Sequence, residues 1–556
     1  MVSTAATVLR EARASARQIG AFGWASLIVG ALMLLPIVTV VASVFHDGGA
    51  TWAHLLEIGL GRYTWNTVLL LLGVACGVLS TGVITAWLVS AYRFPGRRIL
   101  EWALILPLAM PAYVMAYAYT DWLQFTGPVQ TWLREITGWG AREYWFPEIR
   151  SIWGAAAILS FALYPYVYLI ARTAFLDLSR SAIEAGRLAG YSAWGSFFRV
   201  AVPLARPAIA AGTALALMEA LADFGTVSYF ALEVFATGIF KAWLSLGDLV
   251  AASQLAACLL GFVALVLAVE RKSRGRAAYY SSSPKKPARP QRLRGAGAAI
   301  AVIACVVPVG FGFLLPAIIL LRLAIGELDA RWGTQIFELI GNSLLAGGVT
   351  AVVAVLVATM MAYAGRLSKT RLVAMANRVA ALGYALPGPV IAIGVLVPLG
   401  RLDNWLATSI ENIFGVSTGL ILTGTVAALV YAYLVRFLAV ALQTTEAGLA
   451  KITPNMVDAA RGLGATPAVT LARIHAPLLA STLLTAGLLV FVDVLKELPA
   501  TLALRPFNFD TLAVSAYNLA KDERLGEAAV PSLMIVAIAL LPLIFVSRRI
   551  TRTESR

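Results

Sequence analysis

The sequence predicts an all-α membrane protein that crosses the bilayer about twelve times, in two parallel repeats of six helices. Of its 556 residues 60% are hydrophobic and only 13% are charged, whereas a soluble domain carries about 25% charged residues. Apolar runs of about 20 residues, each long enough to span a bilayer as a helix, recur along the chain. A transmembrane β-barrel is excluded, because its strands alternate apolar and polar residues over about ten positions.

Twelve apolar spans divide into two halves. In order, we expect them at residues 22–45, 66–90, 99–122, 151–175, 205–231, 248–269, 296–324, 340–364, 372–398, 417–441, 479–504 and 527–547. Residues 270–295, rich in Lys, Arg, Pro and Ser, predict a basic cytoplasmic linker. The predicted first half is therefore 1–269 and the second 296–556. Six spans per half is an even number, so the halves share one orientation, as parallel repeats do.

The placement of positive charge predicts the topology. The net charge is +15, and most Lys and Arg residues fall on one side of the membrane if both termini are placed in the cytoplasm. This is the positive-inside asymmetry of membrane proteins. This asymmetry explains the basic charge without a nucleic-acid partner. We therefore expect the chain to contact the lipid bilayer and not nucleic acid.

Short polar landmarks recur in the two halves at nearly equal offsets. The pairs are Asn66-Thr67 with Asn342-Ser343, Met110-Pro111 with Gly388-Pro389, and Thr237 with Thr511. Their repetition supports a pseudo-twofold axis along the membrane normal, on which a substrate path is expected.

The longest repeat is a polar loop between the fourth and fifth spans of each half. The copies lie near residues 179–204 and 453–478, and their matched acids, Glu184 and Asp458, are 274 positions apart. Matched positions also hold Ala185 and Ala459, Arg187 and Arg461, Gly190 and Gly464, Arg199 and Arg473, and Pro203 and Pro477. Both copies fall on the predicted cytoplasmic side.

Each copy predicts two short helices joined at a glycine. Gly190 and Gly464 follow a short helical stretch, where a left-handed residue ends a helix. Ser192 and Thr466 can then cap the next helix. We expect this pair of helices to protrude from the membrane surface, and its small residues allow another protein to approach closely.

The pattern of an acid, two small residues, then Gly and Pro at fixed spacing resembles the cytoplasmic loop of permease subunits of binding-protein-dependent ABC importers. Mild departures are Gly186, Asp458 and Ala476. The resemblance implies a type I permease fold and coupling helices that dock on two copies of a cytoplasmic ATPase. The ATPase-coupling residues that it implies are Glu184, Ala185, Gly186, Gly190, Asp458, Ala459, Ala460 and Gly464.

The chain lacks a phosphate-binding loop of the form Gly-x-x-x-x-Gly-Lys-Ser/Thr, and residues 365–370 only approach it. We therefore expect no enzyme activity, no catalytic residue and no bound cofactor. ATP and Mg would be used by the partner ATPase. The alternative class of protein is an ion-coupled secondary transporter. Such a transporter needs no ATPase, and a repeated cytoplasmic docking loop would have no function in it.

Four acids in predicted spans are candidates for the translocation path. Glu219 and Asp223 match Asp493 and Glu497 at the offset of 274 residues. Each pair is spaced i, i+4, which predicts one helix face. Intramembrane acids are costly and usually face a cavity, and carboxylates suit a hard cation. Interhelical pairing or salt bridges near a helix end are the alternative. No metal ligand set is firmly assigned.

Several stretches look like fused ferric-iron permeases. They are residues 222–227, 496–501, 504–507 and 509–513. This likeness implies a bacterial inner-membrane protein that receives Fe(III) from a periplasmic ferric-binding protein. Related permeases carry thiamine, phosphonate, polyamines, sulfate or molybdate, which remain alternative substrates.

Overall fold

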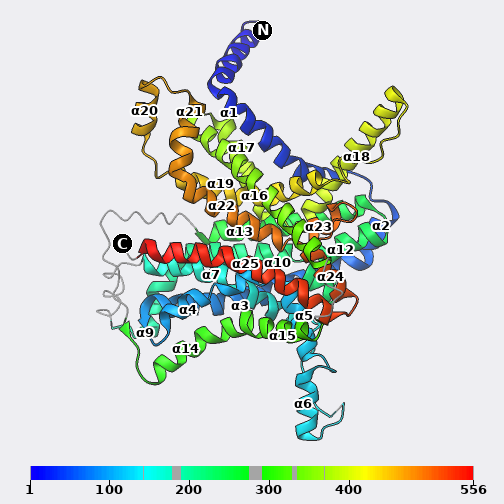
Figure 1. The fold of residues 1–556 in the computed structure, drawn as a ribbon, viewed down its shortest axis with the longest axis vertical. Coiled ribbons are helices and arrows are strands. Elements are labelled where there is room, and N and C mark those ends of the chain that lie inside the picture. The colour runs from blue at the N-terminus through cyan, green and yellow to red at the C-terminus, as the bar shows by residue number, and fades with distance from the viewer. Residues whose placement is uncertain are drawn as a thin grey trace. The chain divides into compact units, whose positions relative to one another are not determined.

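The computed structural model describes residues 2–141, 143–177, 190–274, 291–327, 335–368 and 370–554. These residues are almost entirely helical, which confirms the predicted all-α class (Figure 1). In the described ranges the strands are limited to β1 (Tyr92–Arg93) and β2 (Gln291–Arg292), which pair in parallel.

The helices form two compact units, which comprise residues 1–47 with 334–514, and 48–333 with 515–556. The main helices of the first unit are α1 (Val2–Ser43), α16 (Gln335–Leu367), α17 (Arg371–Ala381), α18 (Gly388–Phe414), α19 (Val426–Leu449), α20 (Pro454–Gly462), α21 (Pro467–Thr470), α22 (Ala476–Leu495) and α23 (Pro499–Leu504).

The second unit begins with α2 (Gly49–His54), α3 (Leu60–Ala91), α4 (Arg97–Ala103), α5 (Ala112–Leu123), α6 (Pro128–Thr137), α7 (Ile152–Leu176), α9 (Ala193–Ser196) and α10 (Val202–Ala222). It continues with α11 (Gly225–Tyr229), α12 (Phe235–Phe240), α13 (Leu249–Arg274), α14 (Ala296–Val309), α15 (Leu315–Gly326) and α25 (Leu525–Glu554). The boundary between the units falls within α24 (Leu512–Lys521), after residue 514.

The compact units exchange helices relative to the two halves of the sequence. Helix α1, the first of the chain, packs against α16, α17 and α18, which follow residue 334. Helices α14 and α15 lie after the basic linker but pack against α3, α4 and α5. Each unit therefore takes the first span of the other half, a pairing that hydropathy alone does not reveal.

Among the residues that the structure describes, eleven helices are long and apolar enough to cross a membrane, or up to 12 if one bent pair counts as a span. That pair, Arg97–Ala109 with Ala112–Thr137, is bent by 92°. It replaces the continuous span that we predicted at 99–122. The predicted span at 372–398 is likewise broken, into α17 and α18.

Prolines explain both breaks. Pro111 and Pro387 are the N-caps of α5 and α18, and the residues before them, Met110 and Leu386, have extended backbones with ψ of 112° and 126°. A residue before proline is pushed out of the helical region by the pyrrolidine ring. The structural equivalent of Pro111 is therefore Pro387, and not Pro389 as the landmark alignment suggested.

Several helices start in the same register in both units. Three pairs of helices start 274 residues apart: α7 and α19 at residues 152 and 426, α10 and α22 at residues 202 and 476, and α11 and α23 at residues 225 and 499. Landmark residues of the two halves make equivalent hydrogen bonds as well. The Asn66 side chain donates to the Glu233 carbonyl at 2.9 Å, and that of Asn342 donates to the Asp510 carbonyl at 3.0 Å. The two repeats therefore share a fold and not only a sequence pattern.

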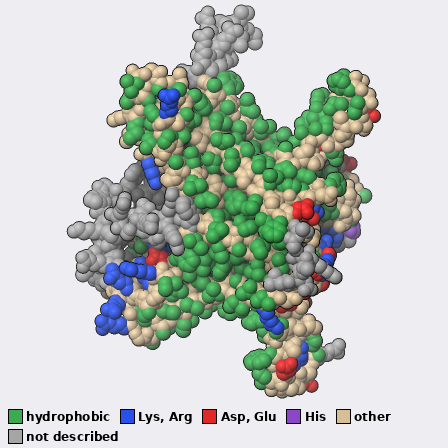
Figure 2. All heavy atoms as spheres, in the orientation of Figure 1, with side chains coloured by type: hydrophobic (Ala, Val, Ile, Leu, Met, Phe, Trp, Pro, Cys, Tyr) green, Lys and Arg blue, Asp and Glu red, His purple; other side chains and the backbone are tan. Residues whose placement is uncertain are grey.

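Apolar side chains spread over much of the exterior (Figure 2). Exposed examples on α1, α3 and α14 are Ile28, Leu72 and Ile300. In water such a surface would aggregate, so large exposed apolar areas mark contact with another apolar phase. Together with the lengths of the helices, this surface identifies a multi-pass membrane protein.

Candidate functional site

The second repeated loop folds as two short helices joined at Gly464. Helix α20 ends at Gly462, and Gly464 has φ of +81°. The Ala465 amide donates to the Ala460 carbonyl at 3.0 Å, which is the 6→1 bond of a Schellman turn. Helix α21 then begins after Thr466, whose side chain accepts a bond from the Val469 amide. The predicted helix, glycine turn and cap are all present.

The first copy has the same turn where the structure describes it. Gly190 has φ of +78°, and the Gly195 amide donates to the Ser192 hydroxyl at 3.1 Å, at the start of α9. Glu184, Ala185 and Gly186 lie outside the described residues. The match of the two glycines and their following caps indicates one loop design used twice.

The outer surface of the second loop is apolar as well as acidic. Asp458 and Ala459 are exposed, whereas Ala460 is buried under the loop. Leu463 is 88% exposed, and Met456 and Val469 are also exposed. These three residues were not among those predicted from the sequence. Leu463 immediately precedes the turning glycine, and this position is the signal that could have found it.

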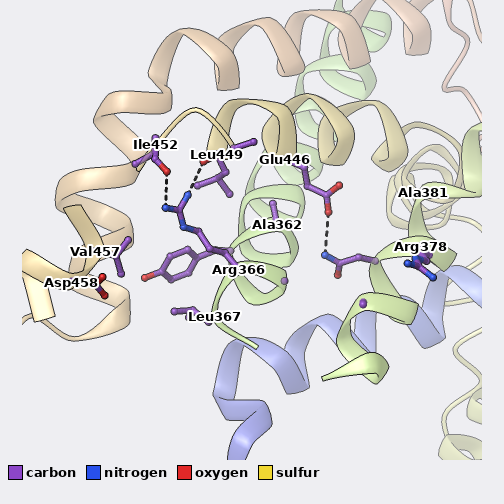
Figure 3. Close-up of a pocket in the computed structure, with 15 residues that line it drawn as sticks. Ala362, Arg366, Leu367, Arg378, Ala381, Glu446, Leu449, Ile452, Val457 and Asp458 are labelled. Carbon is purple, nitrogen blue, oxygen red and sulfur yellow. Dashed lines mark hydrogen bonds between the residues drawn. The ribbon is translucent and has the colours of Figure 1, made fainter. Parts of the chain in front are cut away.

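Helix α16 holds the base of the second loop (Figure 3). The Arg366 guanidinium donates to the carbonyls of Leu449 and Ile452 at 2.7 and 2.8 Å, where α19 ends. The Tyr363 hydroxyl donates to the Pro467 carbonyl at 3.0 Å, at the start of α21. These two side chains therefore tie α16 to the residues on both sides of the loop. Neither was predicted, since nothing in the sequence marks an Arg or Tyr in an apolar span as a loop anchor.

A cavity of about 940 Å³ opens beside this loop (Figure 3). Val457 and Asp458 of α20 line one side, and Asn377 and Arg378 of α17 line another. Within it the Asn377 amide donates to the Glu446 carboxylate at 3.3 Å. The loop therefore borders a cavity on one side.

Asp223 and Glu497 lie where their spans break, and each caps the short helix that follows. Asp223 Oδ1 accepts bonds from the Thr226 and Val227 amides at 3.0 and 3.3 Å. Glu497 accepts from the Ala500 and Thr501 amides, both at 3.1 Å. Carboxylates at a helix N-terminus satisfy free amides and favour the local dipole.

This placement corrects the predicted i, i+4 helix face. Helix α10 ends at Ala222, and Asp223 is extended with ψ of 123°. Helix α22 ends at Leu495, before Glu497. Glu219 and Asp493 remain on the helices, one turn earlier, and Asp493 pairs with Lys496 at 3.2 Å. The spans are shorter than predicted because the capping carboxylates start new helices.

The four acids do not make a compact metal centre. In the part of the chain that the structure describes, no three His, Cys, Asp or Glu side chains group as metal ligands. Both units nevertheless place a pair of acids at the same break, and so the match predicted from the sequence holds in position.

A helical multi-pass protein with two equivalent modules, each carrying an exposed loop, has the architecture of a transport permease. The model of the family described as "Binding-protein-dependent transport system inner membrane component" matches residues 78–271 and 354–553. These matches cover more than half of the chain, with one in each half, and the chain belongs to this family.

Characterised relatives differ in how much of the chain they resemble. The Fe(3+)-transport system permease protein FbpB 2 of Haemophilus influenzae is 24% identical over 94% of this chain and 97% of its own. The sulfate transport system permease protein CysT of Escherichia coli is 28% identical over 38% and 73%. The molybdenum transport system permease protein ModB of Escherichia coli is 30% identical over 31% and 73%. The iron permease therefore resembles both halves, and the other two each resemble part of the chain.

Proposed function

We propose that this chain is the complete membrane-spanning part of an ABC importer, in which one polypeptide replaces two permease subunits. The observation that carries the proposal is the pair of loops that turn at Gly190 and Gly464 with φ of +78° and +81°. Each loop is the docking site for one ATPase subunit. The ATPase subunits, and not this chain, hydrolyse ATP with Mg. The termini and both loops then face the cytoplasm of a bacterial inner membrane.

The surface of the second loop supports docking of a protein with an apolar groove. Leu463 projects from the turn, and Asp458 lies on α20 next to it. An apolar anchor surrounded by polar groups is the usual form of an interface hot spot. Arg366 and Tyr363, which tie the loop to α16, would pass its movement on to the membrane helices.

Ferric iron is the substrate that we favour, delivered by a periplasmic ferric-binding protein. The iron permease FbpB 2 is similar over 94% of this chain, an extent that includes most of both halves. Four acids at two matched helix breaks also favour a cation over an oxyanion. Sulfate and molybdate permeases share part of the sequence, so an oxyanion importer is the second candidate.

Reconstitution in lipid with the ATPase tests the substrate. We would measure ATP hydrolysis after adding binding proteins loaded with Fe(III), sulfate or molybdate in turn. The proposal predicts that only the ferric-loaded protein stimulates hydrolysis, and that ⁵⁵Fe enters the vesicles. Stimulation by a sulfate- or molybdate-loaded protein alone would refute iron as the substrate while leaving the importer assignment in place.

A further inference from the structure

Helix α6, in the connection between α5 and α7, carries its apolar side chains on one stripe. The stripe follows the spacing i, i+3, i+4 and i+7, which defines one helix face, and consists of Val129, Trp132, Leu133 and Ile136. Trp132 and Ile136 are 61% and 63% exposed. In a water-soluble protein such a stripe packs on the core, whereas here its largest side chains are left open.

Polar side chains of α6 are engaged by the chain itself. The Gln130 amide donates to the Leu123 carbonyl at 2.8 Å, and the Tyr144 hydroxyl donates to Gln130 Oε1 at 2.8 Å. The Arg134 guanidinium donates to the Phe125 carbonyl at 3.0 Å and to the Tyr144 hydroxyl at 2.9 Å. The helix is thus fixed through two polar side chains, and its apolar stripe is free to meet a partner.

The end of α18, in the connection that leads to α19, repeats this arrangement with different residues. The Asp403 carboxylate is buried and accepts hydrogen bonds from the backbone amides of residues 421–423, at 2.7 to 3.1 Å. Trp405 and Ile413, on the same helix, are 64% and 72% exposed. In both connections a polar side chain therefore ties the helix to the returning segment, and large apolar side chains stay exposed.

Both helices lie at the end of the spans that is opposite to the docking loops. The first connection precedes α7, and the loop that turns at Gly190 follows α7; the second connection precedes α19, and α20 follows α19. Within its own unit, α6 projects across the direction of α3 and α7, and the end of α18 projects across that of α16 (Figure 1). A helix that lies across the spans runs along the plane of the membrane.

Exposed tryptophans mark the membrane surface at this end of the spans. Trp65 and Trp153 are 63% and 65% exposed, in the first two turns of α3 and α7. These two helices run parallel, since small residues meet in ascending order, Gly73 against Ala156 and Gly77 against Ser160. Tryptophan gathers at the headgroup level of a bilayer. The connection that contains α6 therefore starts and ends close to that level.

We propose that the two connections, residues 124–141 with 143–151 and residues 399–425, are surface anchors that lie in the lipid headgroup region, with their apolar stripes inserted between the lipids. The stripes continue the apolar exterior that contacts the bilayer (Figure 2). Tryptophan on an apolar helix face is typical of helices that lie in this interface. The inference goes beyond the proposed function, because it holds for any substrate.

Spin labels on each surface anchor test its contact with lipid. The three native cysteines are first replaced by alanine. Single cysteines are then introduced in the full chain as Ile136→Cys and Ile413→Cys on the stripes. Glu135→Cys and Glu411→Cys, at exposed positions nearby, are the matched controls. The chain is placed in nanodiscs of phosphatidylethanolamine and phosphatidylglycerol, and the collision rates of each label with oxygen and with a water-soluble nickel chelate are measured.

Oxygen dissolves in lipid, so the labels on the stripes should collide more with oxygen and those at the control positions more with nickel. Collision mainly with nickel at all four positions would place the anchors in water and overturn the proposal. Loss of oxygen access on adding the periplasmic binding protein would assign the stripes to that protein, and spin–spin broadening would assign them to a second copy of this chain. Either result would also overturn the proposal.

Discussion

The conformation of Gly464 gives the sharpest test of the docking loops. The turn requires φ of +81°, and a Cβ placed there would meet nothing within 4 Å. A Gly464→Val substitution therefore acts first on the backbone, since the Cβ atom that it adds meets no neighbouring atom within 4 Å. Gly462, two residues earlier at the end of α20, is equally open but helical.

The expected effect of Gly464→Val follows from the cost of a left-handed conformation. An L-residue in this region pays about 1–2 kcal/mol, which reduces the population of the native turn by about 5–30-fold. The 6→1 bond from Ala465 to Ala460 is lost when the turn changes. If docking needs the native turn, the affinity for the ATPase falls by up to the same factor.

The assay is the dissociation constant between the ATPase and the permease in lipid nanodiscs. Gly462→Ala is the matched control and should bind normally, because alanine favours a helix over glycine by about 0.5–1 kcal/mol. Gly464→Asn should lie between wild type and Gly464→Val, since asparagine tolerates the left-handed region. Equal binding by Gly464→Val, Gly462→Ala and wild type would refute the role of the turn in docking.

Five further substitutions, in three sets, test contacts within the individual units. Arg366→Ala should lower the stability of the loop base by about 1–3 kcal/mol, as a shift of the thermal melting curve, because the carbonyls of Leu449 and Ile452 lose a charged donor; unchanged melting would contradict this. Asn66→Ala and Asn342→Ala should destabilise the protein equally, by about 1 kcal/mol each in the same assay, because their bonds are equivalent; unequal effects would argue against equivalent modules. The Arg436 guanidinium is buried and lies 3.3 Å from the Glu497 carboxylate. Glu497→Ala should therefore cost about 3–5 kcal/mol because it leaves this guanidinium without its carboxylate, whereas Glu497→Gln should cost less; equal melting of the two variants would contradict the ion pair.

The sequence predicted what depends on local patterns. Hydropathy located the spans, and the spacing around Gly190 and Gly464 predicted two left-handed turns, which the structure has. The same pattern placed Thr466 as a helix cap, and its side chain does accept a backbone amide. These features need only residues a few positions apart, and for this reason a single sequence suffices.

Features that depend on distant residues were missed or misjudged. The exchange of α1 and α14 between the compact units involves contacts across hundreds of residues, and no local pattern encodes it. Arg366 looked like an ordinary charge at the end of a span, although it holds the loop base. The acids were expected on continuous helices because hydropathy cannot detect that Asp223 and Glu497 start new ones.

The stoichiometry of the complex tests the central claim most directly. Native mass spectrometry of the purified assembly would count the ATPase chains bound to one copy of this chain. Two docking loops in one polypeptide predict one permease with two ATPase subunits, and one of the two ATPase subunits should dissociate at a higher protein concentration from the Gly464→Val variant than from the wild type. A wild-type complex with two permease chains and two ATPase subunits would contradict the account.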